Sequence, residues 1–166
     1  MISSQAFDPA QHRLAAQRWF EDFSLGEVFI LPSRTVTDAH FAAFQALSGD
    51  NHPIHYDVEY CRRHGHRGLL AHGLQVLCFV AAGAGQFPHQ VEESLIGFIE
   101  QSAQFRAPAY AGDTLYPRLE IIELRPQRTT GVVVMRATIH NQARLLVLEG
   151  EQKYLLRKRP DAEAAP

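Results

Sequence analysis

A segment in the middle of the chain, residues 69–84, is apolar on nearly every side and constrains the fold more than any other part of the sequence. Its letters, "LLAHGLQVLCFVAAGA", include no charged residue. A helix that is apolar all round lies inside a protein or crosses a membrane. At about 16 residues, this one is shorter than the ~20 residues that a membrane span needs. The sequence therefore predicts a buried helix over residues 69–84, enclosed by the rest of the chain.

The second half of the chain is expected to supply the enclosing layer. Its apolar and polar residues alternate as in half-buried strands, and turn-forming residues separate the runs. Gly112 and Asp113 mark one turn, and Gly150 is expected to form a β-bulge in the last strand. Strands are predicted over residues 27–31, 33–36, 95–108, 115–126, 129–141 and 145–156. A sheet with one apolar face buries that face best by curling around the helix, so an α+β fold with a curved antiparallel sheet is predicted.

Another helix is predicted just before a group of polar residues. Thr37 has the kind of side chain that favours the position before a helix, and Phe41 and Phe44 follow at a spacing that gives the helix an apolar face. Gly49 suits the left-handed conformation that ends many helices. Asp50 is therefore expected to begin an irregular segment, where side chains from separate elements can converge.

The stretch "SGDNHPIHYD" places a carboxylate, Asp50, five residues before an imidazole, His55. Pro53 fixes its own φ and biases His52 towards an extended conformation, so the connection between the two groups is short and stiff. A carboxylate and an imidazole around one water molecule can take a proton from it and return a proton to carbon. The alternative is that Asp50 only forms a turn and His55 is a surface base. The spacing alone favours that alternative, because aspartate is common in turns.

A second candidate element is "AHG", at the beginning of the apolar segment. Gly73 would lie near the helix start, where backbone N–H groups lack partners and the helix dipole favours negative charge. Such an N–H can hold a carbonyl oxygen that gains charge in a transition state. The alternative is that Gly73 only allows close packing and that His72 is a hydrogen-bonded core histidine. On these residues alone the alternative is favoured.

The region around these two elements resembles a known family. "FQALSGDNHPIHYDVEY" is similar to the pattern Ser-Gly-Asp-x-Asn-Pro-(Ile/Leu)-His of the (R)-specific enoyl-CoA hydratase and MaoC-like dehydratase family. "RWFEDFSLGEVF", "GLLAHGLQV" and "FRAPAYAGDTL" resemble further segments of that family, in the same order. The resemblance implies a hotdog fold over residues 19–159, in which a curved antiparallel sheet wraps a long central helix. Residues 1–18 are then an N-terminal lead, and residues 160–166 a disordered tail.

The resemblance also implies an activity in fatty acid metabolism and a homodimer. Asp50 and His55 would hold the catalytic water, and the N–H of Gly73 would polarise a thioester carbonyl. Water would add to the 2,3-double bond of a trans-2-enoyl-CoA to give an (R)-3-hydroxyacyl-CoA, or leave in the reverse reaction. The acyl group would be carried by CoA or by an acyl carrier protein. No metal or redox cofactor is implied.

Three neighbouring residues are expected to shape this site: His52, Pro53 and His72. His52 departs from the family pattern, which has an asparagine there, and a histidine is bulkier and can titrate. A second departure lies in residues 78–85, "CFVAAGAG", which contain no hydroxyl where some hydratases carry a serine. The substrate is therefore expected to differ from a simple straight-chain enoyl group.

Three other functions are compatible with these residues. The first is a non-catalytic acyl-CoA-binding hotdog protein in which His52 prevents the chemistry. The second is a hotdog thioesterase, which also needs an activated water, although the Asp-x4-His element argues against it. The third is a metal site, because six of the nine histidines lie between residues 40 and 72. "HPIH" and "HGH" are poor ligand spacings for a loop, so a metal site is not expected.

Charge and cysteine usage limit the partners. The 16 Lys and Arg are balanced by 18 Asp and Glu, for a formal net charge of -2, so no basic face for nucleic acid is expected. Cys61 and Cys78 are too few for a disulfide framework, and the first residues lack the apolar run of a signal peptide. We expect free thiols, a cytoplasmic location, and no nucleic-acid or membrane partner.

Overall fold

The computed structural model describes residues 8–160, which form one antiparallel sheet of seven strands. The main path runs β1-β5-β6-β7-β3, while β2 also pairs with β5 and β4 with β7. The strands are β1 Val28–Ile30, β2 Arg34–Thr35, β3 Leu95–Gln101, β4 Gln104–Phe105, β5 Thr114–Pro126, β6 Thr130–Asn141 and β7 Leu146–Arg157. The predicted antiparallel sheet is confirmed. Residues 1–7 of the predicted lead and residues 161–166 of the predicted tail lie outside the described residues.

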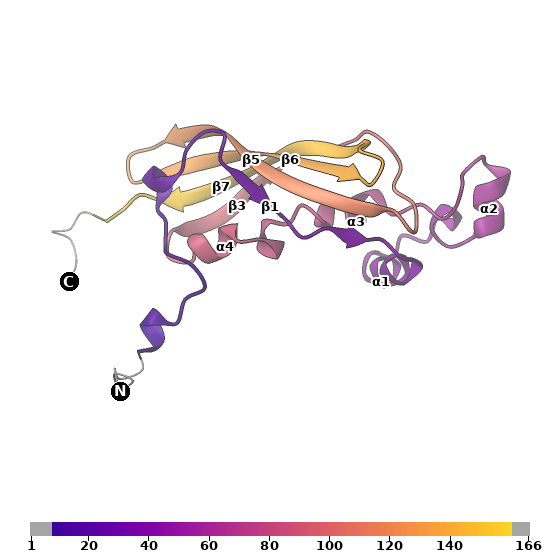
Figure 1. Ribbon diagram of the computed structural model, residues 1–166, viewed down its shortest axis with the longest axis horizontal. Helices are drawn as coiled ribbons and strands as arrows, with labels where there is room; N and C mark the ends of the chain where they lie inside the picture. The colour runs from indigo at the N-terminus through magenta and orange to yellow at the C-terminus, as the bar shows by residue number, and fades with distance from the viewer. Residues whose placement is uncertain (1–7, 161–166) are drawn as a thin grey trace.

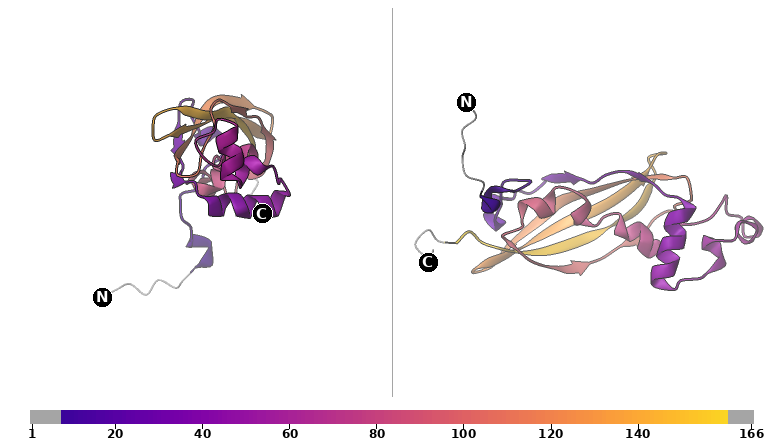
Figure 2. Two further views of the ribbon diagram at one scale, coloured as in Figure 1. Left: turned by 90° about the vertical axis from the view of Figure 1, so that its right-hand side faces the viewer. Right: turned by 90° about the horizontal axis from the view of Figure 1, so that it is seen from below.

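Short helices cover one face and one end of this sheet. They are α1 Asp38–Ser48, α2 Val58–Arg63, α3 Gly73–Cys78 and α4 Phe87–Gln90, with 3₁₀ turns η1 Pro9–Gln11, η2 Phe20–Asp22, η3 Pro53–His55 and η4 Ala82–Ala84. α3 and α4 lie under the sheet, α1 lies at its end, and α2 projects beyond α1 (Figure 1). Seen along the long axis, the sheet curves around the helical segments (Figure 2). In residues 8–160, no helix is both long enough and apolar enough to cross a membrane.

The core lies between the inner face of the sheet and the helical segments. Residues alternate along most of β5 and from Met135 onward in β6, so that Leu119, Met135 and Ile139 are fully buried, while residues 131–135 of β6 are all buried. Val80 and Phe87 meet them from the helical side. Removal of such apolar surface from water is the main stabilising contribution, at about 25 cal/mol per Å².

The continuous helix expected over residues 69–84 is wrong in its length, because α3 covers only Gly73–Cys78. Residues 69–71 are extended instead and pair with the chain just before β5. The Ala71 N–H donates to the Ala109 carbonyl at 2.8 Å, and an isolated bridge joins Leu70 to Tyr110. The expected enclosure of residues 69–84 is also only partly met: Val76 and Val80 are buried, but Leu74 is 63% exposed and Cys78 is exposed.

The far end of the same segment is also interrupted. The buried Gln152 side chain of β7 donates to the Val80 carbonyl at 2.7 Å. A helix that continued past Val80 would need this carbonyl as its own acceptor. Gly83 and Gly85 follow, and glycine weakens a helix by about 1 kcal/mol relative to alanine. The chain therefore continues as the short turns η4 and α4.

The prediction that Gly150 forms a bulge is also wrong. Gly150 pairs with Ala137 in regular register, and the shift between β6 and β7 lies between Ile139 and His140. A Cβ at position 150 would collide with the Ser102 carbonyl. The glycine is needed because the predicted strand over residues 95–108 breaks at residues 102–103, where its backbone crosses closely over β7.

Candidate active site

Asp50 lies just after α1, where the chain turns sharply. Thr37 precedes α1, and its N–H donates to His40 Nδ1 at 3.1 Å. At the other end, Gly49 has a φ of 72°, a conformation that glycine adopts without steric cost. Both predicted ends of α1 are confirmed. The turn at Gly49 directs the chain away from the helix axis, so that Asp50 begins the segment leading to His55.

His55 is the last residue of η3, and a backbone carbonyl fixes its ring. His55 Nδ1 lies 2.8 Å from the Leu70 carbonyl oxygen, and because a carbonyl only accepts, Nδ1 carries the proton. The lone pair is then on Nε2, which lies 3.9 Å from Asp50 Oδ2. That distance is too long for a direct hydrogen bond, but one water molecule can bind both atoms. The Asp50 carboxylate is half exposed, while the His55 ring is nearly covered.

His72 precedes α3 and lies against both members of this pair. It is 1% exposed, and its ring stacks on that of His55 with centroids 3.7 Å apart and planes inclined by 22°. Its Nε2 donates to the backbone carbonyl of Asp50 at 3.2 Å. Its Nδ1 has no hydrogen-bond partner within residues 8–160. The ring of Phe44 also packs against it, at 5.0 Å between centroids.

The surroundings of His55 favour its uncharged form. Burial lowers the pKa of His55 below its ordinary value, because the imidazolium loses hydration. The Leu70 carbonyl and the Asp50 carboxylate act in the opposite direction, while His72 and His52 add to the lowering. With the pKa below its ordinary value of about 6.5, His55 is uncharged at pH 7. Its Nε2 is therefore available to accept a proton.

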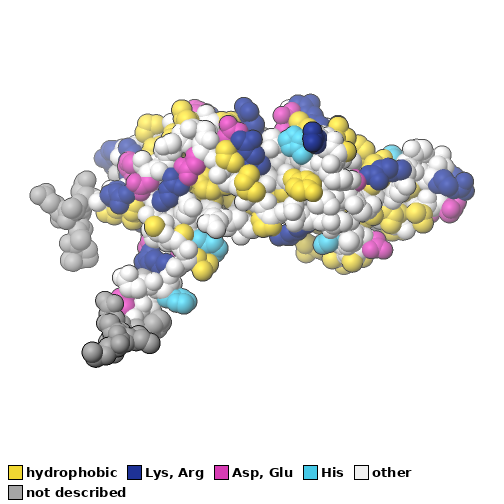
Figure 3. Space-filling model, in the orientation of Figure 1, with side chains coloured by type: hydrophobic (Ala, Val, Ile, Leu, Met, Phe, Trp, Pro, Cys, Tyr) yellow, Lys and Arg dark blue, Asp and Glu magenta, His cyan; other side chains and the backbone are white. Residues whose placement is uncertain are grey.

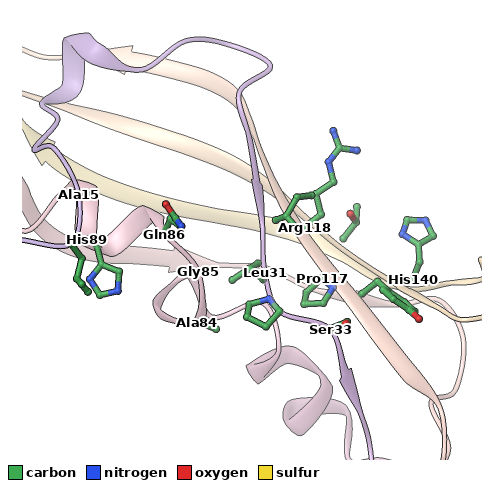
Figure 4. A pocket seen from close by; sticks show the side chains of 15 residues that line it. Ala15, Leu31, Ser33, Ala84, Gly85, Gln86, His89, Pro117, Arg118 and His140 are labelled. Carbon is green, nitrogen blue, oxygen red and sulfur yellow. The ribbon is translucent and has the colours of Figure 1, made fainter.

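A cavity of about 380 Å³ lies beside His55. The residues that line it with His55 are Asp38, Ala39, Ala42, Gln45, Tyr56 and Leu69. A neighbouring cavity of about 270 Å³ is lined by Gly73 and Phe105, among others. A larger cavity, about 980 Å³, lies between the β1–β2 connection and the segment around α4 (Figure 4), and no site residue predicted from the sequence lines it.

A comparison with protein families decides the assignment: the family described as "MaoC like domain" matches residues 22–143. This chain belongs to the MaoC-like domain family. The 3-hydroxybutyryl-CoA dehydratase of Methylorubrum extorquens is 26% identical over 145 residues, which are 87% of this chain and 88% of that protein. The (R)-specific enoyl-CoA hydratase of Rhodospirillum rubrum is 27% identical over 135 residues, 78% of this chain and 91% of that protein.

Solved structures agree with this family. The monoamine oxidase regulatory protein from Archaeoglobus matches with a TM-score of 0.82 and 28% identity, over 89% of this chain and 99% of that one. A Mycobacterium tuberculosis protein with a double hotdog fold matches with a TM-score of 0.72 and 29% identity, over 90% of this chain and 47% of that one. The MaoC-like domain therefore has the hotdog fold that the sequence resemblance implied.

In this MaoC-like domain, His52 caps the turn that carries His55. Its Nδ1 accepts the Ile54 N–H at 3.3 Å, and its backbone is extended, with ψ of 131°, as predicted from Pro53. The His52 ring lies 6.4 Å from the His55 ring and inclined to it by 71°. Asparagine is among the best residues at such a capping position. His52 thus fills the capping position that the asparagine of the family pattern can also fill.

Gly73 lies next to the site formed by Asp50, His55 and His72, but not within it. It follows His72 and begins α3, but it lines the neighbouring cavity rather than the one beside His55. A Cβ at position 73 would lie 3.2 Å from the Phe105 ring, so close packing is one reason for the glycine. Asp50, His55 and His72 form the central cluster, and Gly73 lies at its border.

The central cluster offers ligand atoms from Asp50, His55 and His72 within 4.8 Å of one another. Two features of the geometry do not suit a metal ion. The His55 and His72 rings lie in nearly parallel planes, stacked 3.7 Å apart, so lone pairs in these two planes are poorly placed to meet at one ion. His72 Nε2 is also engaged by the Asp50 carbonyl.

The buried carboxylate of Asp113 anchors the segment that leads into α3, a role that the sequence did not indicate. Asp113, only 1% exposed, accepts hydrogen bonds from the Arg67 guanidinium, the Tyr110 N–H and the Gln142 side chain. Arg67 also lies over the Tyr110 ring, 4.2 Å from its centroid. Because Arg67 is close in sequence to Leu70, this anchor helps to place the carbonyl that binds His55. The sequence showed an acidic residue in a turn, but not its burial.

Asp113→Asn is expected to lower the free energy of unfolding at pH 7 by about 2 kcal/mol, because a charged acceptor of several hydrogen bonds is lost. Burial alone would raise the pKa of Asp113, but the bonds from Gln142, Tyr110 and Arg67 outweigh it and lower the pKa. The stabilisation is thus present above a pH of about 4 and is lost as the pH falls through the folded-state pKa. Denaturant unfolding from pH 7 to pH 2 should show a constant difference from wild type down to about pH 4 and a shrinking difference below it. A difference that stayed constant over the whole range would contradict this account.

Proposed function

We propose that this MaoC-like domain is a hydro-lyase acting on the 2,3-double bond of an acyl thioester, converting trans-2-enoyl-CoA to (R)-3-hydroxyacyl-CoA or the reverse. The observation that carries the proposal is the distance of 3.9 Å between Asp50 Oδ2 and His55 Nε2, together with the cavity that His55 lines. Relatives that are named dehydratases and hydratases support the same class of reaction.

In hydration, the oxygen of a water between Asp50 and His55 attacks C3 of the enoyl group, while one of its protons passes to His55 Nε2. The π electrons of the double bond move towards C2 and the thioester oxygen. The His55 imidazolium then gives a proton to C2, so the sum is one water added across the double bond. Asp50 accepts the second O–H of the water and stabilises the imidazolium. Such acid–base help typically contributes about 10²–10⁴-fold.

The thioester oxygen gains charge in this step and needs a donor. We assign this role to the Gly73 N–H, because the first N–H groups of a helix lack intrahelical partners. The absence of a side chain at Gly73 leaves room for the thioester next to the backbone, in the cavity bordered by Phe105. The chemistry requires no metal ion, and the stacking of the His55 and His72 rings in nearly parallel planes favours a water over a metal. CoA or an acyl carrier protein enters only as part of the substrate.

His52→Asn is expected to change the hydration rate by less than about threefold, because both residues can accept the Ile54 N–H. His52→Ala removes the cap and should lower the free energy of unfolding by about 1 kcal/mol. Initial rates on one enoyl-CoA and denaturant unfolding of both variants measure this. A large gain of activity in His52→Asn would show that His52 alters the chemistry instead.

A second copy of the chain is proposed to pair along β3. This strand forms one edge of the sheet, and edges with apolar side chains are prone to pair with another strand. The large apolar residues of β3 and β4 that are about half exposed are Ile96, Phe98, Ile99 and Phe105. Sedimentation equilibrium should give the mass of two chains, and a monomer at micromolar concentration would contradict this assembly.

No nucleic-acid or membrane partner is proposed. Positive and negative side chains are interspersed on the face of the molecule seen in Figure 3. That pattern fits the near balance of acidic and basic residues in the chain and gives no single-sign surface for a polyanion.

The direct test is a panel of trans-2-enoyl-CoA esters of different length and branching, followed by the loss of ultraviolet absorbance of the conjugated thioester. Hydration of at least one member is expected. Release of free CoA thiol without prior hydration would identify a thioesterase. A protein that binds CoA esters but is inert on the whole panel would be a non-catalytic binder.

A further inference from the structure

We propose that His72 is a positioning residue that fixes the His55 ring and the Asp50 backbone relative to each other. The inference rests on the proposed function of the Asp50–His55 pair. His72 has no assigned chemical step, yet it is the buried side chain that touches both members of the pair. It covers a face of the His55 ring at 3.7 Å and donates from Nε2 to the Asp50 carbonyl at 3.2 Å.

These contacts leave His55 little freedom. The Leu70 carbonyl binds its Nδ1, and His72 blocks one ring face. The same His72 side chain holds the backbone of the residue that carries the carboxylate. A misplacement of reacting groups by about 1 Å can cost roughly 10²-fold in rate, so a side chain that couples the two positions has a direct effect on catalysis.

The hydrogen bonds of His72 involve one ring nitrogen only. Its Nε2 donates to the Asp50 carbonyl, and its buried Nδ1 has no partner among the described residues. The charged or titratable groups that face His55 are Asp50, His52 and His72, with Asp38 and Tyr56 lining the adjoining cavity. Of these, only the His72 ring is stacked on His55 and shields it from water.

Two substitutions separate the two contacts of His72. His72→Phe keeps a ring against His55 but removes the donor to the Asp50 carbonyl. His72→Gln keeps an amide donor in the place of Nε2 but removes the ring. Each should lower kcat by about 10–100-fold with KM nearly unchanged. His72→Gln should also move the acidic limb of the kcat/KM profile to higher pH, and by more than His72→Phe, because His55 is then more hydrated and its pKa rises.

His64 provides a matched control. Its ring stacks on Tyr60 at 4.1 Å with planes inclined by 22°, and its Nδ1 lies 2.8 Å from the Tyr60 carbonyl. It therefore makes the same two kinds of contact as His72, but to a residue outside the pair. His64→Phe and His64→Gln should keep the wild-type kcat and the wild-type pH profile.

The titration of the His55 ring, followed by NMR without substrate, tests the inference independently of the activity. A His55 pKa that rises more in His72→Gln than in His72→Phe would support it, even if no substrate had been found. Wild-type kcat or an unchanged His55 titration in a folded His72→Gln would overturn it. If His72→Gln does not fold, a wild-type kcat in His72→Phe would overturn it and a lowered kcat would support it. Failure of the enoyl-CoA panel would instead count against the proposed function.

Discussion

Asp50→Asn and His55→Ala are each expected to lower kcat for hydration of an enoyl-CoA by about 10²–10⁴-fold. Asp50→Asn keeps the shape of the side chain but removes the charge that orients the water and stabilises the imidazolium. His55→Ala removes the base outright. Neither substitution touches the sheet, so the free energy of unfolding should change by less than about 1 kcal/mol in Asp50→Asn, as for most surface positions. Steady-state rates and denaturant unfolding measure both quantities.

The double variant makes this expectation sharper. Because both side chains are proposed to act on one water molecule, removing both should be about as harmful as removing the more important one. Glu59→Gln and His64→Gln on and beside α2 change a carboxylate and an imidazole outside the site, and should retain the wild-type rate. If Asp50→Asn and His55→Ala kept that rate as well, the assignment of the pair would be wrong.

Gly150→Ala is expected to lower the free energy of unfolding by about 3 kcal/mol, since a Cβ forced into a closely packed backbone crossing strains both segments. The added carbon would collide with the Ser102 carbonyl, where the chain passes from β3 to β4. Neither backbone segment can rotate away as a flexible side chain would, because the Ser102 N–H is bonded to the Glu151 carbonyl at 2.9 Å.

Gly97→Ala on β3 is the matched control for Gly150→Ala. Gly97 also lies within a strand of the same sheet, but an added Cβ there would meet nothing within 4 Å. Denaturant unfolding should find Gly97→Ala close to wild type. Equal stability of the two alanine variants would refute the explanation given for Gly150.

Local patterns in the sequence were sufficient for much of the fold. Thr37 and Gly49 mark the two ends of α1. Both ends could be predicted because each depends only on residues close to it in sequence. The alternation of apolar and polar residues along β5, β6 and β7 predicts strands, because every second residue of a strand lies on the same face and that face packs on the core. The proximity of Asp50 and His55 could also be predicted, since the chain between them is short and Pro53 stiffens it.

Other features depend on partners that are distant in sequence. The apolar residues 69–84 were expected to form one helix, but hydrogen bonds from residues near 109 and from Gln152 divide the segment. The stacking of His72 on His55 and the Leu70 carbonyl that fixes the His55 tautomer arise only when these segments meet in space. Burial of Asp113 likewise follows from the folded sheet, because aspartate in a turn is normally exposed.

The strand order carries a consequence for the folding of the chain. Residues 69–71 pair with residues near 109, β1 pairs with β5, and both β3 and the end of the central segment depend on β7. Contacts between distant parts of a chain form slowly and leave apolar surface open to aggregation meanwhile. Asp50 and His55 lie close to the apolar segment, yet the end of that segment lacks its partner until Leu146–Arg157 has joined the sheet. The candidate site is thus expected to form late in folding, after β7 is in place.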